Sequence, residues 1–345
     1  MLTPGEENIP EEKITEEQVP EEKTLEVTIP EAKAPEIKVP EVKVSFKSGY
    51  CSIIGLPNSG KSSLLNAILG QKLSITTPKP QTTRKNILGI HTEPDHQVIF
   101  LDTPGIVKPS YLLQEKMLEE IGESLSDADV IIILYDIDYD PTFEKVHAEE
   151  LIQKVLTHYT KPLIAVVNKI DKSNQEALVA ALESLSATEK FKAVIPVSAA
   201  HDVNINDVLQ TVISHLPEGP RYYDEDVVSS ESERFFVSEI IREKIFGLFS
   251  DEIPFSTEVE IQEFVERTNS KHFISAAIYV ERDSQKQILI GAKGKAIKKI
   301  GEKARPDIEV FLDHEVYLEL IVKVRDNWRT DEKMLKSFGY IKDEE

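Results

Sequence analysis

The chain has 345 residues, and at roughly 150 residues per domain this length indicates two domains and a remainder. Hydrophobic residues make up 40% and charged residues 29%, which is typical of a globular protein and excludes wholesale disorder. The longest apolar stretch, residues 130–135, is much shorter than the about 20 residues that cross a membrane. Cys51 is the single cysteine, which excludes an intramolecular disulfide and a cysteine-based zinc cluster. The N-terminus lacks the basic flank and apolar core of a secretory signal, so we expect a soluble protein of a reducing compartment.

The net charge of −21 argues against a nucleic-acid partner, but the charge is unevenly distributed. Residues 286–305 contain one acid, Glu302, and seven bases, a local charge of +6. The bases are Lys286, Lys293, Lys295, Lys298, Lys299, Lys303 and Arg305. The overall acidity therefore conceals one strongly basic segment.

Residues 1–45 repeat the pattern Ile/Val-Pro-Glu-x-Lys with a period of ten and hold 12 Glu and 5 Lys. Regularly spaced proline blocks a helix or a central strand, and the apolar content is too low to offset the entropy of ordering. We predict a disordered tail over residues 1–45, acting as a solvating spacer or, alternatively, as a partner-binding segment.

Between residues 46 and 218, short apolar runs alternate with amphipathic stretches. Strands are predicted at residues 50–54, 88–93, 97–102, 130–135, 163–167 and 193–197. Helices are predicted at residues 62–69, 113–125, 143–158, 175–185 and 205–215. This alternation predicts an α/β domain with a mainly parallel sheet covered on both faces. A Pro/Gly break and an acidic stretch then predict a linker over residues 219–233.

Residues 234–345 are predicted to form a second, small α+β domain. We expect helices at residues 234–249 and 296–303, and strands at residues 257–266, 273–281 and 316–324.

The first motif, G-x-x-x-x-G-K-S, follows a predicted strand and opens a predicted helix. Backbone N–H groups in such a loop, with the helix N-terminus, cradle phosphate oxygens. Lys61 would contact the β- and γ-phosphates, and Ser62 would bind Mg²⁺. The expected nucleotide-binding residues here are Gly55, Leu56, Pro57, Asn58, Ser59, Gly60, Lys61, Ser62 and Ser63.

A second motif, D-x-x-G, ends the predicted strand at 97–102 and comprises Asp102, Thr103, Pro104 and Gly105. Its carboxylate reaches the Mg²⁺ shell, and the Gly105 N–H meets the γ-phosphate. The polar stretch of residues 74–86 between the two motifs is predicted to be a switch whose threonine joins the metal when the γ-phosphate is present. We favour Thr83 for this ligand, with Thr82 as the alternative.

Asn168, Lys169 and Asp171 follow the strand at 163–167 in the pattern N-K-x-D, and the loop Ser198, Ala199 and Ala200 follows the next strand. A carboxylate at Asp171 accepts two hydrogen bonds from guanine that adenine does not offer, which selects GTP over ATP. The second loop would donate a backbone N–H to the guanine O6. Lys61, Thr83 and Gly105 are the candidate catalytic residues.

The basic segment contains a G-x-x-G loop that leads into the helix expected at residues 296–303, with an apolar wall of Ile290, Ile297 and Ile300. Such a loop presents backbone amides to single-stranded RNA, and the lysines add attraction to its phosphates. The candidate RNA-binding residues are Lys286, Ile290, Gly291, Ala292, Lys293, Gly294, Lys295, Ile297, Lys298 and Lys299.

Taken in this order, the motifs resemble those of the Era-like GTPases, with a TrmE-Era-EngA-type GTPase domain and a type II KH domain. The resemblance spans about residues 46–345 and includes residues 81–84, 89–93, 238–244 and 331–340. It implies GTP hydrolysis, GTP/GDP and Mg²⁺ as ligands, a monomer, and binding to the 16S rRNA 3′ end during maturation of the 30S subunit. In some members it also implies peripheral association with the inner membrane, beside a cytoplasmic pool.

Three departures qualify the resemblance. The repeats of residues 1–45 lie outside the usual core, and Ala292 is small for the second position of the RNA loop. Ile106 follows the D-x-x-G motif where many signalling GTPases carry a water-orienting glutamine, so we expect slow intrinsic hydrolysis. The alternatives are a signalling GTPase with a protein or membrane effector, and an RNA-binding scaffold with a degenerate nucleotide site.

Overall fold

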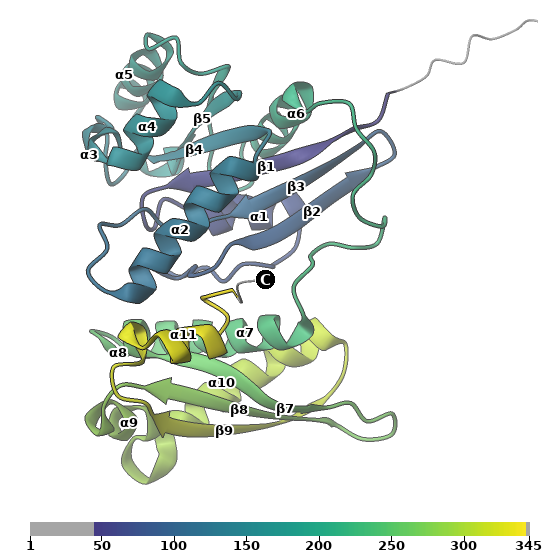
Figure 1. Cartoon of the computed structure of the whole chain (residues 1–345), viewed down its shortest axis with the longest axis vertical. Coiled ribbons are helices and arrows are strands. Elements are labelled where there is room, and N and C mark those ends of the chain that lie inside the picture. The colour runs from purple at the N-terminus through teal and green to yellow at the C-terminus, as the bar shows by residue number, and fades with distance from the viewer. Residues whose placement is uncertain (1–44, 343–345) are drawn as a thin grey trace, which may run out of the picture. The chain divides into compact units, whose positions relative to one another are not determined.

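The computed structural model describes residues 45–342, so the proposed tail of residues 1–45 lies almost entirely outside the described residues. The first domain contains a six-stranded sheet in the order β2-β3-β1-β4-β5-β6 (Figure 1). Only the β2–β3 pair is antiparallel. The strands are β1 (Lys47–Gly55), β2 (Ile87–Glu93), β3 (His96–Asp102), β4 (Val130–Asp136), β5 (Leu163–Asn168) and β6 (Ala193–Pro196).

Helices cover both faces of this sheet, as the strand–helix alternation predicts. One buried cluster joins the sheet to α1 (Lys61–Leu69) and α6 (Ile205–His215). A second joins the opposite face to α2 (Leu112–Asp127), α3 (Glu144–Ala148), α4 (Glu150–His158) and α5 (Gln175–Ser186). Strands buried on both faces require near-continuous apolar sequence, and β4 is buried at every position. Cys51 is completely buried in the first cluster, as expected for a core residue.

The single helix predicted at residues 143–158 is wrong, because Glu149 is extended (φ −70°, ψ 125°) and separates α3 from α4. At about 100° per residue, Phe143 and Ile152 would lie on opposite sides of one continuous helix. Both are buried in the same cluster. The break therefore lets two short helices bury side chains that one helix could not.

The second domain has a three-stranded sheet of β7 (Glu258–Val265), β8 (His272–Val280) and β9 (Val316–Val324). The β7–β8 pair is antiparallel and the β8–β9 pair is parallel. Three helices pack on it through one buried cluster: α7 (Glu233–Leu248), α9 (Asp283–Ile290) and α10 (Lys295–Leu312). Helix α10 runs nine residues beyond its predicted end, through Pro306, because Ile300, Ala304 and Ile308 form a buried stripe at intervals of four.

Two short helices complete the chain, α8 (Ile253–Ser256) and α11 (Glu332–Ser337). The C-terminal segment forms a cluster in which Trp328 and Leu335 pack against Leu113 and Met117 of α2. Trp328 is completely buried and donates its indole N–H to the Ser256 carbonyl at 2.9 Å. Trp328 therefore has a packing role in this cluster. Within residues 45–342, no helix combines the length and the apolar character needed to span a membrane.

The predicted linker lies along the first sheet in a defined conformation. The Gln97 side chain of β3 accepts hydrogen bonds from the N–H groups of Tyr222 and Tyr223 and donates one to the Tyr223 carbonyl. In addition, the Ile90 N–H of β2 donates to the Val228 carbonyl, and the Ser229 hydroxyl donates to the Leu88 carbonyl. Ser232 then caps α7 by accepting from Phe235 N–H.

Candidate functional site

The phosphate-loop motif lies between the end of β1 and the start of α1, as its sequence predicts. Gly60 is in the left-handed region at φ 99°, and a Cβ there would come within 2.2 Å of Asn168 Nδ2. Glycine at this position therefore satisfies both the backbone and the available space. The loop points its helix N-terminus at the site where phosphate would bind.

Lys61 is buried and donates to the Gly55 carbonyl at 3.3 Å and to the Leu56 carbonyl at 3.0 Å. Burial lowers the pKa of Lys61 to about 8, and the negative charge of Asp102 opposes this shift. The ammonium thus lies over the loop, as a phosphate contact requires.

Three oxygen-bearing side chains meet beside Lys61. Ser62 Oγ lies 2.7 Å from Asp102 Oδ2 and 2.9 Å from Thr83 Oγ1, and Thr83 Oγ1 lies 3.5 Å from Asp102 Oδ2. Asp102 is completely buried, and burial raises its pKa against the hydrogen bond from Ser62 and the charge of Lys61. Its Oδ1 is buried with no hydrogen-bond partner among the described residues. A carboxylate with a spare oxygen and two hydroxyls form a hard oxygen set that fits Mg²⁺.

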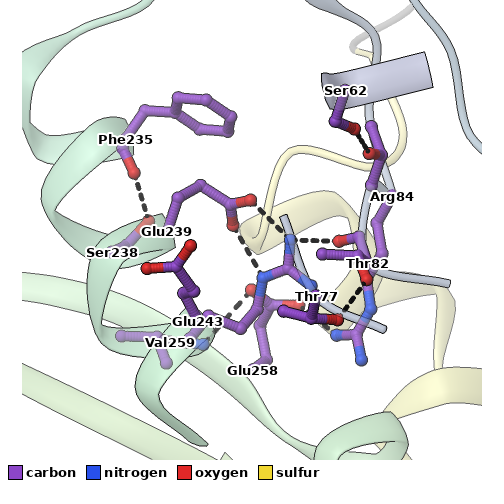
Figure 2. Close-up of polar contacts among 12 residues, drawn as sticks. Ser62, Thr77, Thr82, Arg84, Phe235, Ser238, Glu239, Glu243, Glu258 and Val259 are labelled. Atoms are coloured by element: carbon purple, nitrogen blue, oxygen red, sulfur yellow. Dashed lines mark hydrogen bonds and ion pairs between the residues drawn. The ribbon is translucent and has the colours of Figure 1, made fainter. Parts of the chain in front are cut away.

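Thr82 points elsewhere. Its hydroxyl donates to the Lys79 carbonyl at 2.8 Å. It also lies 2.8 Å from Thr77 Oγ1 (Figure 2). Of the two threonines considered for the metal, Thr83 is the one whose hydroxyl lies beside Ser62 and Asp102.

The D-x-x-G segment is pressed against the phosphate loop. A Cβ at Gly105 would lie 2.7 Å from Pro57 Cα, and Ile106 N–H donates to the Gly55 carbonyl at 3.1 Å. Gly105 lines a small recess of about 60 Å³ with Lys61, Ser62 and Thr83. Ile106 is buried and offers no polar group to that recess.

The predicted guanine-recognition residues meet at the carboxyl end of β5. Asn168 donates to the Ser59 carbonyl at 2.8 Å and accepts from Ala199 N–H at 3.1 Å, which ties three loops together. The Ser198 hydroxyl donates to Asp171 Oδ1 and lowers the pKa of Asp171. Ala200 is exposed at the same loop.

Asp136, at the end of β4, was not identified from the sequence. It is buried and pairs with Lys169 at 2.5 Å, while Lys169 Nζ also donates to the Asn58 carbonyl at 2.8 Å. The pair lays the Lys169 stem over the phosphate loop. An acid at the end of an apolar strand was the available signal, but sequence spacing does not identify its partner.

The G-x-x-G loop joins α9 to α10. Gly291 has φ 70°, and a Cβ there would come within 2.6 Å of Ala296 Cβ. Gly294 has φ 75° with open space around it. Exposed side chains surround the loop: Ala292, Lys293, Lys295, Lys298 and Lys299, with Lys286 half-buried.

A groove of about 440 Å³ lies between α10 and β9. Ile297 and Lys298, two of the candidate RNA-binding residues, line it with Arg305 of the basic segment and with Lys271, Tyr317 and Leu320, which the sequence did not indicate. Ile290 is half-buried, but Ile300 is completely buried in the core. Of the three residues of the expected apolar wall, Ile297 lines the groove, whereas Ile300 packs in the core of the second domain.

Comparison with known proteins gives two family matches within the chain. Residues 50–169 match the family described as "50S ribosome-binding GTPase", and residues 252–329 match the KH domain family. The GTPase Era of Halothermothrix orenii is 45% identical over 86% of this chain and 99% of its own length.

Two solved structures superpose on most of the chain. One is an Era in complex with MgGDPNP and nucleotides 1506–1542 of 16S ribosomal RNA, with a TM-score of 0.81 and 38% identity. The other is a variant of Aquifex aeolicus Era bound to GDP and AlF4⁻, with a TM-score of 0.81 and 37% identity. Each covers 86% of this chain and 99% of the solved chain. This chain therefore belongs to the Era family of GTPases and is a GTP-hydrolysing enzyme.

Proposed function

We propose that this GTPase binds the 3′-end region of 16S rRNA and acts in maturation of the 30S ribosomal subunit. The observation that carries the proposal is one chain holding both a phosphate-loop site and a G-x-x-G helix junction with exposed lysines. Support comes from the 38% identical Era that holds MgGDPNP and 16S nucleotides in one complex.

The nucleotide phosphates contact the loop from Gly55 to Ser63. Lys61 neutralises charge on the β- and γ-phosphates, and Gly105 donates its N–H to the γ-phosphate. Ser62, Thr83 and Asp102 hold Mg²⁺, which supplies further positive charge to the phosphate oxygens. The short distances among the three side chains support this assignment.

Guanine is selected by Asp171, with Asn168 and Lys169 shaping the loop around it and the Ser198–Ala200 loop offering a backbone N–H. The Ser198 hydroxyl orients Asp171 and favours its ionised form, which accepts hydrogen bonds.

Slow hydrolysis follows from Ile106. Its side chain cannot orient water, so the backbone near Gly105 and Thr83, or a bound partner, positions the attacking water. RNA binding is then a candidate stimulus for hydrolysis.

RNA binds the second domain at the G-x-x-G loop and the adjoining groove. Lysines around the loop supply phosphate attraction, while Ile297 and Tyr317 offer apolar surface to the bases. The proposed domains are 46–218 for GTP hydrolysis, 219–233 as linker and 234–345 for RNA. We place the protein, as a monomer, in the cytoplasm, where 16S rRNA is found; peripheral association with the inner membrane stays a prediction.

The test is ultraviolet cross-linking of the full chain, loaded with a non-hydrolysable GTP analogue, to RNA in cell extract. We expect enrichment of the 16S 3′ end among the attached sequences. Gly294→Asp, which places an anion where phosphate binds, removes this enrichment. Recovery of no specific RNA, with nucleotide-dependent capture of protein or lipid instead, favours the signalling GTPase.

A further inference from the structure

The switch segment between the phosphate loop and β2 is anchored in the second domain by basic side chains. Lys79 Nζ donates to the carbonyls of Phe246, at 2.5 Å, and Phe249. Lys85 Nζ donates to the Phe338 carbonyl at 2.5 Å. Between them, Arg84 makes the most extensive of these contacts.

Arg84 is only 4% exposed. Its Nη1 donates to the Thr257 carbonyl at 2.8 Å and to Glu258 Oε2 at 2.9 Å. Its Nη2 donates to the carbonyls of Pro254, at 3.0 Å, and Phe255, at 3.1 Å. One side chain of the GTPase domain thus donates to four acceptors within residues 254–258, at the end of α8 and the start of β7.

Glu258, the carboxylate that Arg84 binds, is buried and has further polar partners. Burial alone would raise its pKa, but the positive charges of Arg84 and Arg242 and the hydrogen bond from Tyr340 lower it. The Tyr340 hydroxyl donates to Glu258 Oε2 at 2.6 Å. The carboxylate is therefore ionised and held from two sides.

The residue before Thr83 is anchored as well. Arg242 Nη2 donates to the Thr82 carbonyl at 2.5 Å, and Glu239 holds Arg242 through Nε at 2.7 Å (Figure 2). Thr83 therefore lies between a carbonyl bonded to α7 and a side chain bonded to α8 and β7. Its own hydroxyl faces the other way, 2.9 Å from Ser62 Oγ.

We propose that Arg84 and Glu258 are positioning residues of the GTPase site, so that the RNA-binding domain holds Thr83 in reach of Mg²⁺. This rests on the proposed role of Thr83 as a metal ligand. Arg84 directly follows Thr83, so its bonds to Glu258 and to three backbone carbonyls of the second domain restrain the backbone that carries Thr83. Separating the two residues of a buried ion pair leaves a buried charge without a partner, which is costly in free energy. The state with Arg84 bound to Glu258 is therefore strongly favoured over a state in which Arg84 is released.

The consequence is selective for the triphosphate. A switch threonine joins the metal only when the bound nucleotide has a γ-phosphate. The position of Thr83 should therefore affect GTP binding more than GDP binding. Loosening Arg84 is expected to weaken Mg²⁺-dependent binding of a GTP analogue by about tenfold, within the usual range of coupling between sites. GDP affinity is expected to change by less than about twofold, because GDP lacks the γ-phosphate that brings the switch threonine to the metal.

The experiment measures fluorescent GTP-analogue and GDP affinity over a Mg²⁺ titration, together with amide hydrogen exchange of residues 76–86 in the nucleotide-free full chain. The variants are Arg84→Ala and the double variant Arg84→Met/Glu258→Gln, which leaves no buried unpaired charge and guards against misfolding. Both are expected to lose analogue affinity selectively and to exchange faster over residues 76–86.

Two variants separate the possible failures. Thr83→Ala removes the hydroxyl but keeps the anchor, so it should lose analogue affinity without faster exchange. Lys342→Met breaks the exposed ion pair with Glu123, a different contact between the two domains, and should change neither readout. If Thr83→Ala binds the analogue normally, the proposed metal role is wrong. If Thr83→Ala weakens binding while both Arg84 variants match wild type, the positioning role is wrong.

Discussion

The candidate nucleotide site and the proposed RNA groove differ in how their residues are held in place. In the candidate nucleotide site, Lys61, Asp102 and Asn168 are buried, and each is hydrogen-bonded to a residue of the phosphate loop or of the start of α1. These bonds are made by protein groups alone. Around the G-x-x-G loop, the lysines are exposed and the glycine backbone provides the defined geometry. Preorganised buried groups confer chemical selectivity, whereas exposed charges confer affinity that falls with salt. Substitutions in the first region should therefore change which ligand binds, and those in the second should change how tightly.

The largest effect is expected from Asp171→Asn. The amide N–H that this substitution introduces can donate to the carbonyl that xanthine carries where guanine has its amino group. The ratio of GTP affinity to XTP affinity should therefore fall by about a thousandfold and favour XTP. Calorimetric titration with both nucleotides measures this. Ser198→Ala is the milder control, because it removes the hydrogen bond to Asp171 but keeps the carboxylate. An unchanged preference in Asp171→Asn would place the base elsewhere.

Lys61→Met should reduce nucleotide affinity by about a hundredfold, since it removes a buried charge that faces the phosphates. Binding of a 16S 3′-end oligonucleotide to the nucleotide-free variant should stay within about twofold of wild type, because the two sites do not share side chains. Parallel fluorescence titrations compare the two. Equal losses for nucleotide and RNA would contradict the separation of the two regions.

Gly294→Asp should weaken RNA binding by about thirtyfold through repulsion of the phosphate backbone. Gly294→Asn is matched in shape and tolerates the φ of 75° equally well, so it isolates the charge from the backbone strain. Filter binding at two salt concentrations measures both. A similar loss in the two variants would mean that strain, rather than charge, disrupts the loop.

The smallest effect concerns pH. With its pKa lowered to about 8, Lys61 loses its proton as the pH rises through 8, while phosphate binding favours the protonated form. Nucleotide affinity should therefore fall above pH 8, by about tenfold between pH 7 and pH 9. Lys61→Met should show no such fall over the same range. A wild-type profile that is flat over this range would contradict the low pKa.

The nucleotide site was largely predictable from sequence because its parts are contiguous motifs. Gly55 to Ser62 and the run from Asn168 to Asp171 each carry their chemistry within a few residues, at the ends of apolar strands. The KH loop was predictable for the same reason, through Gly291 and Gly294. The alternation of strands and helices in the first domain followed from hydrophobic periodicity, whereas α8, α9 and α11 of the second domain were not predicted.

Contacts between residues far apart in the chain were decided only by the tertiary structure. The Asp136–Lys169 pair spans 33 positions and the Arg84–Glu258 pair spans 174, and neither spacing has a sequence signature. The break at Glu149 and the burial of Ile300 likewise depend on which side chains the neighbouring strands receive. Local motifs determine backbone geometry over one turn or loop, whereas burial and ion pairing depend on surfaces that exist only after the sheet and helices have packed.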